Sequence, residues 1–600
     1  MRPVSQTASA AWLGGAAQLA VGAAMLLWTW GTWPDVLVDS GRELYVPWRL
    51  ASGELLFRDI AYFNGPLSPC LNAACFWLFG ASVRTLVVTN LVLLILLVFL
   101  LNRLLAAVGG RLAATAAGIV FLCMFAFAKY STASGYNYMF PYSHELTHGM
   151  LLSAAALYLL HRYQLRPRLG LIALVGLLVG LVLLTKAEVF VATVLAVVVG
   201  LVLIFWKSGF RASRTFVATA VFVLAALIPT IVSILSLTCG LTASEALWGT
   251  LGSWRWVFDR KLTSLQFYRW VFGSDDMAGS LRAILISAGG LGVLFCIVAA
   301  AAFVLGRWNR YRVAGAGCLA VLCAAAIYVL RQHIAWLDVF RSLPLVLAAA
   351  SVVLAIRIAR LQRGHVDGQA AILRLTLTLF SFVLLGKMLL NVHIVHYGFA
   401  LAMPGTLLLV VMLVSWLPAW IDRRGGAGIA FRTAALVIIG VTVLIHVQFI
   451  GLFMRESTVY VGQGADRFRS GWRGGLVNAS LDTIGTHVGP RQTLAALPEG
   501  VMLNYLSRRV NPTPFINFMP AEMVMFGEDR ILKAFQQNPP DFIALVHKDT
   551  AEYGYRFFGT DYAQKTMSWI RDNYHPVDQV GDTPLRDEHY GVLLMQRNGG

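Results

Sequence analysis

Long runs of apolar residues, separated by short polar segments, recur over the first three quarters of the chain. A helix needs about 20 mainly apolar residues to cross a bilayer. Thirteen segments approach that length, near residues 11–30, 84–107, 112–128, 148–162, 169–185, 189–206, 215–238, 282–305, 313–330, 342–359, 371–390, 398–418 and 430–452. The pattern predicts a polytopic α-helical membrane protein of about 13 transmembrane helices.

The connections between these segments differ in charge. Alternate connections are rich in Arg and Lys and nearly free of acidic residues: NRLLAAVGGR, HRYQLRPR, KSGFRASR, RWNRYR, RIARLQRGH and IDRRGG. Connections of this kind remain in the cytoplasm. The N-terminus is then inside and the C-terminus outside. The outer face receives residues 31–83, 129–147, 239–281, 331–341, 391–397 and the tail from about 454.

The tail has ordinary polarity and a different periodicity. DFIALVH and YGVLLMQ are typical of strands, whereas EDRILKAFQQ and YAQKTMSWIRDNY are typical of amphipathic helices. We therefore expect a transmembrane domain over 1–453 and an extracytoplasmic α/β domain over 454–600.

Composition agrees with a membrane protein. Apolar residues make up 58% and charged residues 13% of the chain, against about 25% charged residues in soluble proteins. The net charge of +18 does not indicate nucleic-acid binding, because the Arg and Lys lie in short tracts between apolar runs. All seven Cys precede residue 324, so no disulfide framework supports the tail.

Candidate chemistry begins directly after the first predicted span, in WPDVLVDSGRELYVPWRLASGELLFRDIAYFNGPLSP. Acidic and basic residues alternate there with Trp, Tyr, Phe and Leu, as in helices that lie in the membrane interface. A carboxylate in such a position can act as a general base, and an Arg can bind a phosphate. Asp39, Glu43, Arg58 and Asp59 are the candidates. The alternative is a solvated loop without chemistry.

Several of these motifs resemble a known family. DSGRE after the first span and LASGELLFRDIAYFNGPL are similar to the glycosyltransferase-C superfamily, closest to the bacterial relatives of protein O-mannosyltransferases and lipid A aminoarabinose transferases. NYMFPYSHELTHG, LLTKAEVF, VHYGFALAMPG, LPEGVMLNYLSRR and DTAEYGYRFFG extend the resemblance over most of the chain.

The resemblance implies a sugar donor carried on a polyprenyl phosphate, an active site on the outer face, and a catalytic acid in the first outer loop. Asp39 matches that acid by position, although eukaryotic O-mannosyltransferases carry two adjacent acids and here Glu43 is four residues away. Cationic groups must stabilise the departing phosphate. The candidates on the outer face are Arg58, Lys186 and His396, with Arg255 and Arg341 behind them.

Three of these segments also have simpler interpretations. Lys186 and Glu188 in LLTKAEVF could form a local ion pair at a span edge. His393 and His396 in VHIVHYG could be ordinary interfacial histidines. FDRKLTSLQFYRWVF, residues 258–272, is typical of an amphipathic interfacial helix. Two polar and aromatic segments of the tail could help select the acceptor, or they could be ordinary surface of the α/β domain. They are NYLSRRVNP and HKDTAEYGYRFFG.

YSHELTHG contains HELTH, a match to the zinc-protease motif H-E-x-x-H. An intramembrane protease would need a third ligand from an Asp-Gly motif, and the candidate in HVDGQ lies on the cytoplasmic side, across about 30 Å of hydrocarbon. His144, His148 and Glu188 could still hold a divalent metal. The preferred hypothesis is metal-free: Glu145 assists Asp39, while Tyr142, His144 and His148 contact the sugar or phosphate.

The sequence therefore predicts an inner-membrane glycosyltransferase. Its partners would be a polyprenyl-phosphate-linked sugar donor, membrane lipid, and a glycan, lipid or protein acceptor. Asp39 and Glu145 would be catalytic, Arg58, Lys186 and His396 would bind phosphate, and Glu43, Asp59, Tyr142, His144, His148 and Glu188 would contact substrate. No cofactor is expected, and a divalent metal is possible. The alternatives are a membrane metalloprotease and a lipid or sugar transporter.

Overall fold

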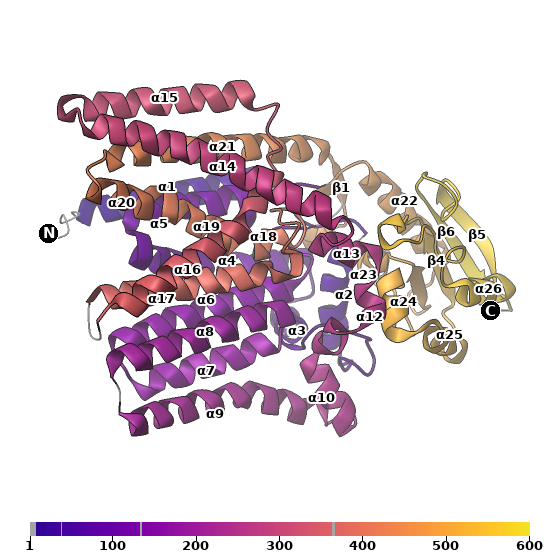
Figure 1. Ribbon diagram of the computed structural model, residues 1–600. Coiled ribbons are helices and arrows are strands. Elements are labelled where there is room, and N and C mark those ends of the chain that lie inside the picture. The colour runs from indigo at the N-terminus through magenta and orange to yellow at the C-terminus, as the bar shows by residue number, and fades with distance from the viewer. Residues whose placement is uncertain (1–7, 38, 132–134, 210, 363–365, 600) are drawn as a thin grey trace.

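The protein is a helical bundle joined at one end to a small α/β domain (Figure 1). The computed structural model describes residues 8–37, 39–131, 135–209, 211–362 and 366–599. The basic connection that ends at His365 is thus only partly within the described residues.

A helix lies at each of the thirteen predicted spans. The helices are α1 (Ala8–Thr29), α4 (Val83–Gly109), α5 (Arg111–Phe121) with the π-helical turn η1 (Leu122–Ala126), α6 (His144–Leu165), α7 (Leu169–Leu183), α8 (Ala187–Ser208), α9 (Ala212–Leu237), α14 (Met277–Gly306), α15 (Arg312–Leu330), α16 (Leu343–Arg360), α17 (Val366–Leu384), the series α18 (Gly398–Leu401), α19 (Met403–Val411), η5 (Met412–Trp416) and α20 (Leu417–Arg423), and α21 (Gly428–Glu456).

Length and hydropathy identify this bundle as membrane-spanning. Among the described residues, nine helices are long and apolar enough to cross a bilayer. Others at predicted spans are shorter, such as Arg111–Ala126 and Leu169–Leu183. The protein is therefore a multi-pass membrane protein, and the count of thirteen spans stays a prediction.

Small residues let neighbouring helices approach closely. A Cβ on Gly176 of α7 would lie 2.2 Å from the carbonyl oxygen of Phe222, and one on Gly180 would lie 2.2 Å from that of Ala226. Both carbonyls belong to α9. Close backbone packing of this kind favours helix association in lipid, where apolar side chains gain little from meeting one another.

Short helices gather at the end of the bundle nearest the α/β domain (Figure 1). They are α2 (Asp39–Ala51), α3 (Leu67–Phe79), α10 (Ala243–Leu251), α11 (Trp254–Val257), α12 (Arg260–Thr263), α13 (Gln266–Phe272), η3 (Asp338–Ser342) and η4 (Leu385–Met388), while η2 (Asn309–Tyr311) joins α14 to α15. The single interfacial helix predicted over 258–272 is wrong. Asp259 caps α12 through the amides of Lys261 and Leu262, and the chain breaks at Leu265 before α13 begins.

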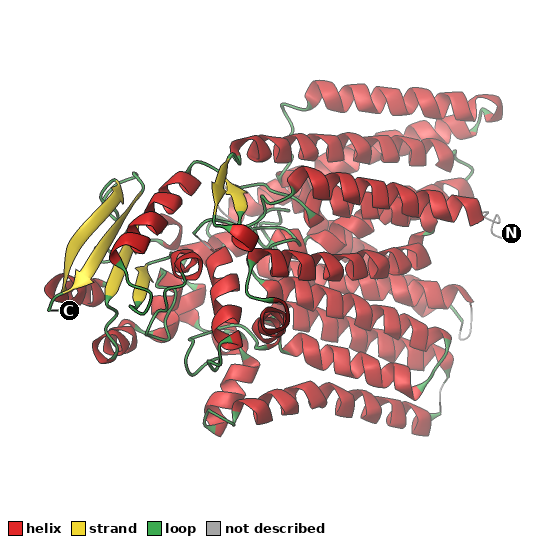
Figure 2. Cartoon of the chain, turned by 180° about the vertical axis from the view of Figure 1, so that it is seen from behind, coloured by secondary structure: helices red, strands yellow, loops and turns green. Residues whose placement is uncertain are grey.

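The tail forms the predicted α/β domain (Figure 2). It contains β1 (Val459–Val461), η6 (Gly464–Asp466), β2 (Phe468–Ser470), α22 (Arg473–His487), β3 (Leu494–Leu497), α23 (Val501–Ser507), α24 (Pro520–Phe526), α25 (Glu528–Gln537), β4 (Phe542–Val546), η7 (Ala551–Tyr553), α26 (Gln564–Asn573), β5 (Tyr574–Gly581) and β6 (Gly591–Arg597). The two strands and two helices predicted from their periodicity are confirmed as β4, β6, α25 and α26.

The main sheet has strand order β3-β4-β6-β5. Strands β3 and β4 run parallel, with Leu494 opposite Phe542 and Leu497 opposite Leu545. The pairs β4–β6 and β5–β6 are antiparallel. The carboxyl ends of β3 and β4 consequently meet at one edge of the sheet.

The two parts of the chain are tightly joined at α2. A Cβ on Gly41 would lie 2.4 Å from the backbone nitrogen of Met502 in α23, so only glycine allows this approach. The hydroxyl of Tyr45 accepts a hydrogen bond from the backbone N–H of Asn511 at 2.9 Å. The α/β domain thus fixes the helix that opens at Asp39.

Candidate active site

A cavity of about 570 Å³ lies between the bundle and the α/β domain. Charged, polar and aromatic side chains line it from both parts of the chain. They include Asp39, Arg42, Tyr142, Lys186, Phe267, His396, Tyr397, Trp472, Arg473, Glu499, Asn517, Glu522, Lys548, Glu552 and Tyr553. The cavity brings together four of the predicted site residues from distant segments: Asp39, Tyr142, Lys186 and His396.

Asp39 is the first residue of α2, and Arg42 follows one turn later. Arg42 Nη2 lies 3.5 Å from Asp39 Oδ1, and the Asp39 side chain keeps 21% of its surface exposed. Burial raises the pKa of Asp39 to about 7; Arg42 offsets part of this effect, and the carboxylate of Glu499 adds to it. A carboxylate with a pKa near neutrality is suited to accept a proton as a general base.

Arg42 is the cation nearest to Asp39, and sequence reasoning did not select it. Its Nη2 donates to the carbonyl oxygen of Tyr142 at 2.8 Å, and its Nε and Nη2 each lie 3.3 Å from Glu43 Oε1. The spacing of Arg42 from Asp39 on one helix face was the available signal. Within this cluster Glu43 is buried, does not line the cavity, and orients Arg42.

His144, the first residue of HELTH, holds Glu43 in its contact with Arg42. Glu43 Oε2 lies 2.6 Å from His144 Nδ1 and accepts the His144 backbone N–H at 3.1 Å. His144 Nε2 lies 3.0 Å from Asn90 Nδ2, which also donates to the carbonyl of Met139. Since an amide nitrogen can only donate, Nε2 must accept and Nδ1 must carry the proton. Burial acts to raise the pKa of Glu43, but the hydrogen bonds from His144 and the positive charge of Arg42 outweigh it and hold this pKa below its usual value.

Glu145 is also buried and lies outside the cavity. Its carboxylate accepts hydrogen bonds from the hydroxyl of Tyr62 and from Ser143 Oγ, the latter at 2.6 Å. Both partners belong to the loops that precede the bundle core. Glu145, the predicted second catalytic acid, therefore connects the loops that contain Tyr62 and Ser143.

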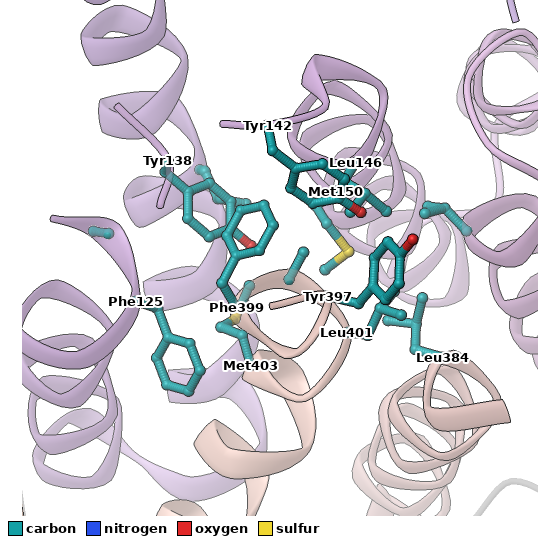
Figure 3. Close-up of a cluster of buried hydrophobic side chains, with 14 of the residues drawn as sticks. Phe125, Tyr138, Tyr142, Leu146, Met150, Leu384, Tyr397, Phe399, Leu401 and Met403 are labelled. Carbon is teal, nitrogen blue, oxygen red and sulfur yellow. The ribbon is translucent and has the colours of Figure 1, made fainter. Parts of the chain in front are cut away.

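Lys186 lies immediately before α8 and faces the rings of Tyr142 and Tyr397, which form an aromatic floor of the cavity. Its Nζ is 3.5 Å from the Tyr142 hydroxyl oxygen and lies over the rings of Tyr142 and Tyr397 at 5.1 and 5.8 Å. Burial lowers the pKa of Lys186 to about 8, helped by the positive charge of Lys387. Figure 3 shows the two tyrosines among apolar side chains that include Leu146, Met150, Phe399 and Leu401.

His396 completes this floor. Its φ of 54° is in the left-handed region, and its ring stacks on Tyr142 with centroids 6.2 Å apart. Burial, together with the charges of His393, Lys387 and Lys186, holds the pKa of His396 well below its usual range. The imidazole is neutral at pH 7, so it can offer a hydrogen bond to a phosphate but not the positive charge expected from the sequence.

The structure leaves the other predicted phosphate and substrate residues outside the cavity. Arg58 and Asp59 pair with each other at 2.8 Å, with 50% and 29% of their side chains exposed. Arg341 pairs with Asp338 at 2.9 Å, and Arg255 lies over the Trp256 ring. Arg58, Arg341 and Arg255 each contact a residue close to them in the sequence, and none of them lines the cavity with Asp39.

The predicted metal-ligand set is not assembled. His148 Nδ1 lies 3.0 Å from Ser68 Oγ, and Glu188 pairs with Lys387 at 2.9 Å. Both ring nitrogens of His144 are already engaged. Over the described part of the chain, no group of three or more His, Cys, Asp or Glu side chains could hold a metal ion.

The protease alternative also fails on geometry. Gln164, near the C-terminal end of α6, donates to the carbonyl oxygen of Gln369 at 3.3 Å. HELTH occupies the first turn of the same 22-residue helix, and a helix rises about 1.5 Å per residue. Gln369, the last residue of HVDGQ, and HELTH therefore lie at opposite ends of α6.

The α/β domain contributes a second wall, which includes part of HKDTAEYGYRFFG, one of the two tail segments that the sequence offered as acceptor-selecting or plain surface. Glu499 follows β3, and His547, Lys548 and Asp549 follow β4, so the carboxyl edge of the parallel strand pair faces the cavity. Ligands of open α/β sheets bind at that edge. The signal in the sequence was the polar run HKDTAEY directly after the strand DFIALV.

The fold and the cavity together define a multi-pass helical membrane protein with an α/β domain over a polar site at one end of the bundle. Solved structures with a similar arrangement include the oligosaccharyltransferase of Archaeoglobus fulgidus in complex with Zn and sulfate, with a TM-score of 0.45 and 11% identity over 88% of this chain and 67% of that chain. AglB of the same organism, bound to an inhibitory peptide and a dolichol-phosphate, gives 0.44 and 11% over 95% and 73%.

ArnT from Cupriavidus metallidurans bound to undecaprenyl phosphate gives a TM-score of 0.42 and 13% identity over 98% of both chains. These neighbours are membrane glycosyltransferases of the glycosyltransferase-C superfamily, which the sequence motifs resemble. At such identities and TM-scores the likeness carries no argument about activity. No family model matches the sequence, and no curated protein matches it.

Proposed function

We propose that this protein is a membrane glycosyltransferase that moves a monosaccharide from a polyprenyl-phosphate donor to a hydroxyl group of an acceptor. The observation that carries the proposal is the meeting, in one cavity, of the Asp39 carboxylate with Arg42 and Lys186. The motif resemblance adds the donor class, because the donor in that superfamily is carried on a lipid phosphate.

In the proposed reaction, Asp39 accepts the proton of the acceptor hydroxyl while that oxygen attacks the anomeric carbon of the donor. The bond from this carbon to the phosphate oxygen breaks, and its electron pair remains on the phosphate. Because the polyprenyl phosphate then gains a second negative charge, cations that contact it stabilise the transition state.

Arg42 and Lys186 are suited to receive that charge. Arg42 is held in place by Tyr142 and Glu43, so little reorganisation is needed when the charge develops. Lys186 is a compact cation on the aromatic floor. Neutral His396, whose Nδ1 has no hydrogen-bond partner among the described residues, can add a hydrogen bond.

The proposal places the cavity and the α/β domain on the extracytoplasmic face of the inner membrane. The C-terminal ends of α8, α14 and α16, each of which leads into a basic connection, lie at the opposite end of the bundle (Figure 1). Basic connections stay in the cytoplasm. A lipid-linked donor fits this location, since nucleotide sugars remain in the cytosol.

The test uses membranes that contain the full-length protein, a panel of polyprenyl-phosphate hexoses and pentoses, and an envelope extract from a deletion strain as acceptor. Sugar transfer is followed by mass spectrometry. Asp39→Asn should lower the rate roughly 10²–10⁴-fold, the usual contribution of a general base. The matched control Asp59→Asn, outside the cavity, should stay within about twofold of wild type.

Two results would overturn the proposal. The first is no transfer by the wild-type protein from any donor of the panel. The second is full activity in Asp39→Asn, which would remove the residue on which the chemistry depends.

A further inference from the structure

The two walls of the cavity differ in charge. The bundle side presents Arg42 and Lys186 around the single carboxylate of Asp39. The α/β domain presents five carboxylates against two basic side chains, namely Glu499, Glu522, Asp549, Glu552 and Glu588 against Arg473 and Lys548. A phosphate is attracted to the first wall and repelled by the second.

Glu522, from α24, is the most constrained carboxylate of this second wall. The residue is only 6% exposed, and its Oε1 accepts a hydrogen bond from Asn517 Nδ2 at 2.9 Å. Its Oε2 is buried and has no partner within the described part of the chain. A buried carboxylate oxygen without a partner is costly, so a hydroxyl group bound at this wall would stabilise it.

Glu522 also reaches toward the residues proposed to act on the donor. Glu522 and Arg42 border a second, small cavity of about 10 Å³. On the same wall, Lys548 Nζ lies 3.2 Å from Glu499 Oε2, and this pair projects from the carboxyl edge of β3 and β4. The polar groups of the α/β domain therefore converge on the side of the cavity that faces Asp39.

Flat aromatic rings accompany these polar groups. Tyr553 of the α/β domain packs on Phe267 of α13 with ring centroids 4.8 Å apart, and both line the cavity. Rings of this kind offer apolar surface, while a few placed polar groups fix the orientation of a ligand.

We propose that Glu522 and the Glu499–Lys548 pair form an acceptor subsite for a hydroxyl-rich group, the sugar ring of a saccharide acceptor. The inference rests on the proposed function and adds the acceptor class and its binding residues. Carboxylates accept hydrogen bonds from sugar hydroxyls, Lys548 donates one, and the negative wall keeps the donor phosphate on the side of Arg42 and Lys186.

The experiment separates acceptor binding from donor binding. Full-length protein in nanodiscs is given the donor that wild type uses, and the saccharide fraction of the deletion-strain envelope is titrated as acceptor. Glu522→Gln should raise the apparent KM for this fraction roughly tenfold or more, as expected when a hydrogen bond to a charged group is lost. The KM for donor should stay within twofold. Glu499→Gln is a second variant with the same expectation, so the test survives if Glu522→Gln fails to fold.

Asp529→Asn is the matched control, because Asp529 lies in the same domain, pairs with Lys565 on the surface and does not line the cavity. It should keep the wild-type KM for the acceptor fraction. An unchanged acceptor KM in both glutamate variants, or an equal rise in donor KM, overturns the subsite. Transfer to the protein fraction of the envelope alone overturns the saccharide class. Failure of wild type with every donor would overturn the proposed function itself.

Discussion

At the scale of single residues, burial shifts the pKa values of Asp39 and Lys186 toward each other. Burial raises the pKa of the Asp39 carboxyl to about 7 and lowers the pKa of the Lys186 ammonium to about 8. In the proposed reaction Asp39 must be deprotonated and Lys186 protonated. The productive form is therefore most populated between these two values.

This pair predicts a narrow bell-shaped pH dependence of kcat/KM, which reports groups of the free enzyme. The rate should rise as pH increases through about 7 and fall as it passes about 8. Lys186→Arg should shift the falling limb to higher pH by more than one unit, because an Arg stays protonated throughout this range. Initial rates between pH 5 and 10 provide the measurement. An unchanged falling limb in Lys186→Arg would exclude Lys186 as its origin.

His144 does not line the cavity. It contacts Glu43, which in turn contacts Arg42, so we infer that His144 positions Arg42. His144→Ala removes the hydrogen bond from Nδ1 to Glu43 and leaves a buried carboxylate short of a partner. We expect kcat/KM to fall about 5- to 150-fold, corresponding to the ~1–3 kcal/mol cost of an unsatisfied buried group. His144→Asn, whose amide can donate from nearly the same place, should recover most of the loss.

The same variants test the metal hypothesis. Because both nitrogens of His144 have protein partners, we expect no zinc at HELTH, so metal analysis should find the same zinc content in wild type and in His144→Ala. Stoichiometric zinc in wild type that is lost in His144→Ala would contradict this assignment. Equal loss in His144→Ala and His144→Asn would count against the positioning role.

At the scale of elements, the contact between α2 and α23 sets the position of the proposed base. Gly41 stands between Asp39 and Arg42 and touches the backbone of Met502. Any displacement of α2 from α23 would therefore move both functional side chains together.

Gly41→Ala should separate the two helices, because its Cβ would approach the Met502 nitrogen to 2.4 Å. We expect a loss of about 1–3 kcal/mol in stability, as for other overpacked contacts, and a clear fall in kcat. Thermal unfolding and transfer rates measure the two effects. Gly53→Ala is the control for steric overlap, because nothing lies within 4 Å of a Cβ at this position. Its φ of 102° adds backbone strain, so it reports the effect of strain without overlap. Wild-type activity in Gly41→Ala would show that α2 tolerates the shift.

Elements were more predictable than the site. Apolar runs of about 20 residues mark spans directly, and the tail strands and helices follow their own periodicities. The single helix expected over 258–272 failed because a local cap at Asp259 and a break at Leu265 override the amphipathic pattern. Periodicity says which face a residue occupies, and it does not say which distant partner that residue meets.

The site shows the same limit. Asp39, Lys186 and His396 were identified from motifs, and the structure brings them together. The sequence analysis selected Arg58 and passed over Arg42, and only the fold shows that Arg42 meets Tyr142 whereas Arg58 pairs with its neighbour. Glu522 gave no local signal, because its place depends on how the last part of the chain docks on the first.

At the scale of the whole molecule, the proposal requires one orientation in the membrane. Fusing alkaline phosphatase, which needs disulfides and hence an oxidising compartment to fold, to the C-terminus should give an active enzyme. A fluorescent protein that matures only in the cytoplasm should stay dark at the same position. The reverse pattern would place the cavity in the cytoplasm and remove the case for a lipid-linked donor on the outer face.

The docking of α2 on α23 has a consequence for the order of biosynthesis. The proposed base is translated directly after the first helix, whereas the residues of the opposite wall follow the last helix of the bundle. A growing chain therefore holds Asp39 and Lys186 without the carboxylates that complete the pocket. In the proposed reaction, transfer can begin only after the α/β domain has been translated and has docked on α2.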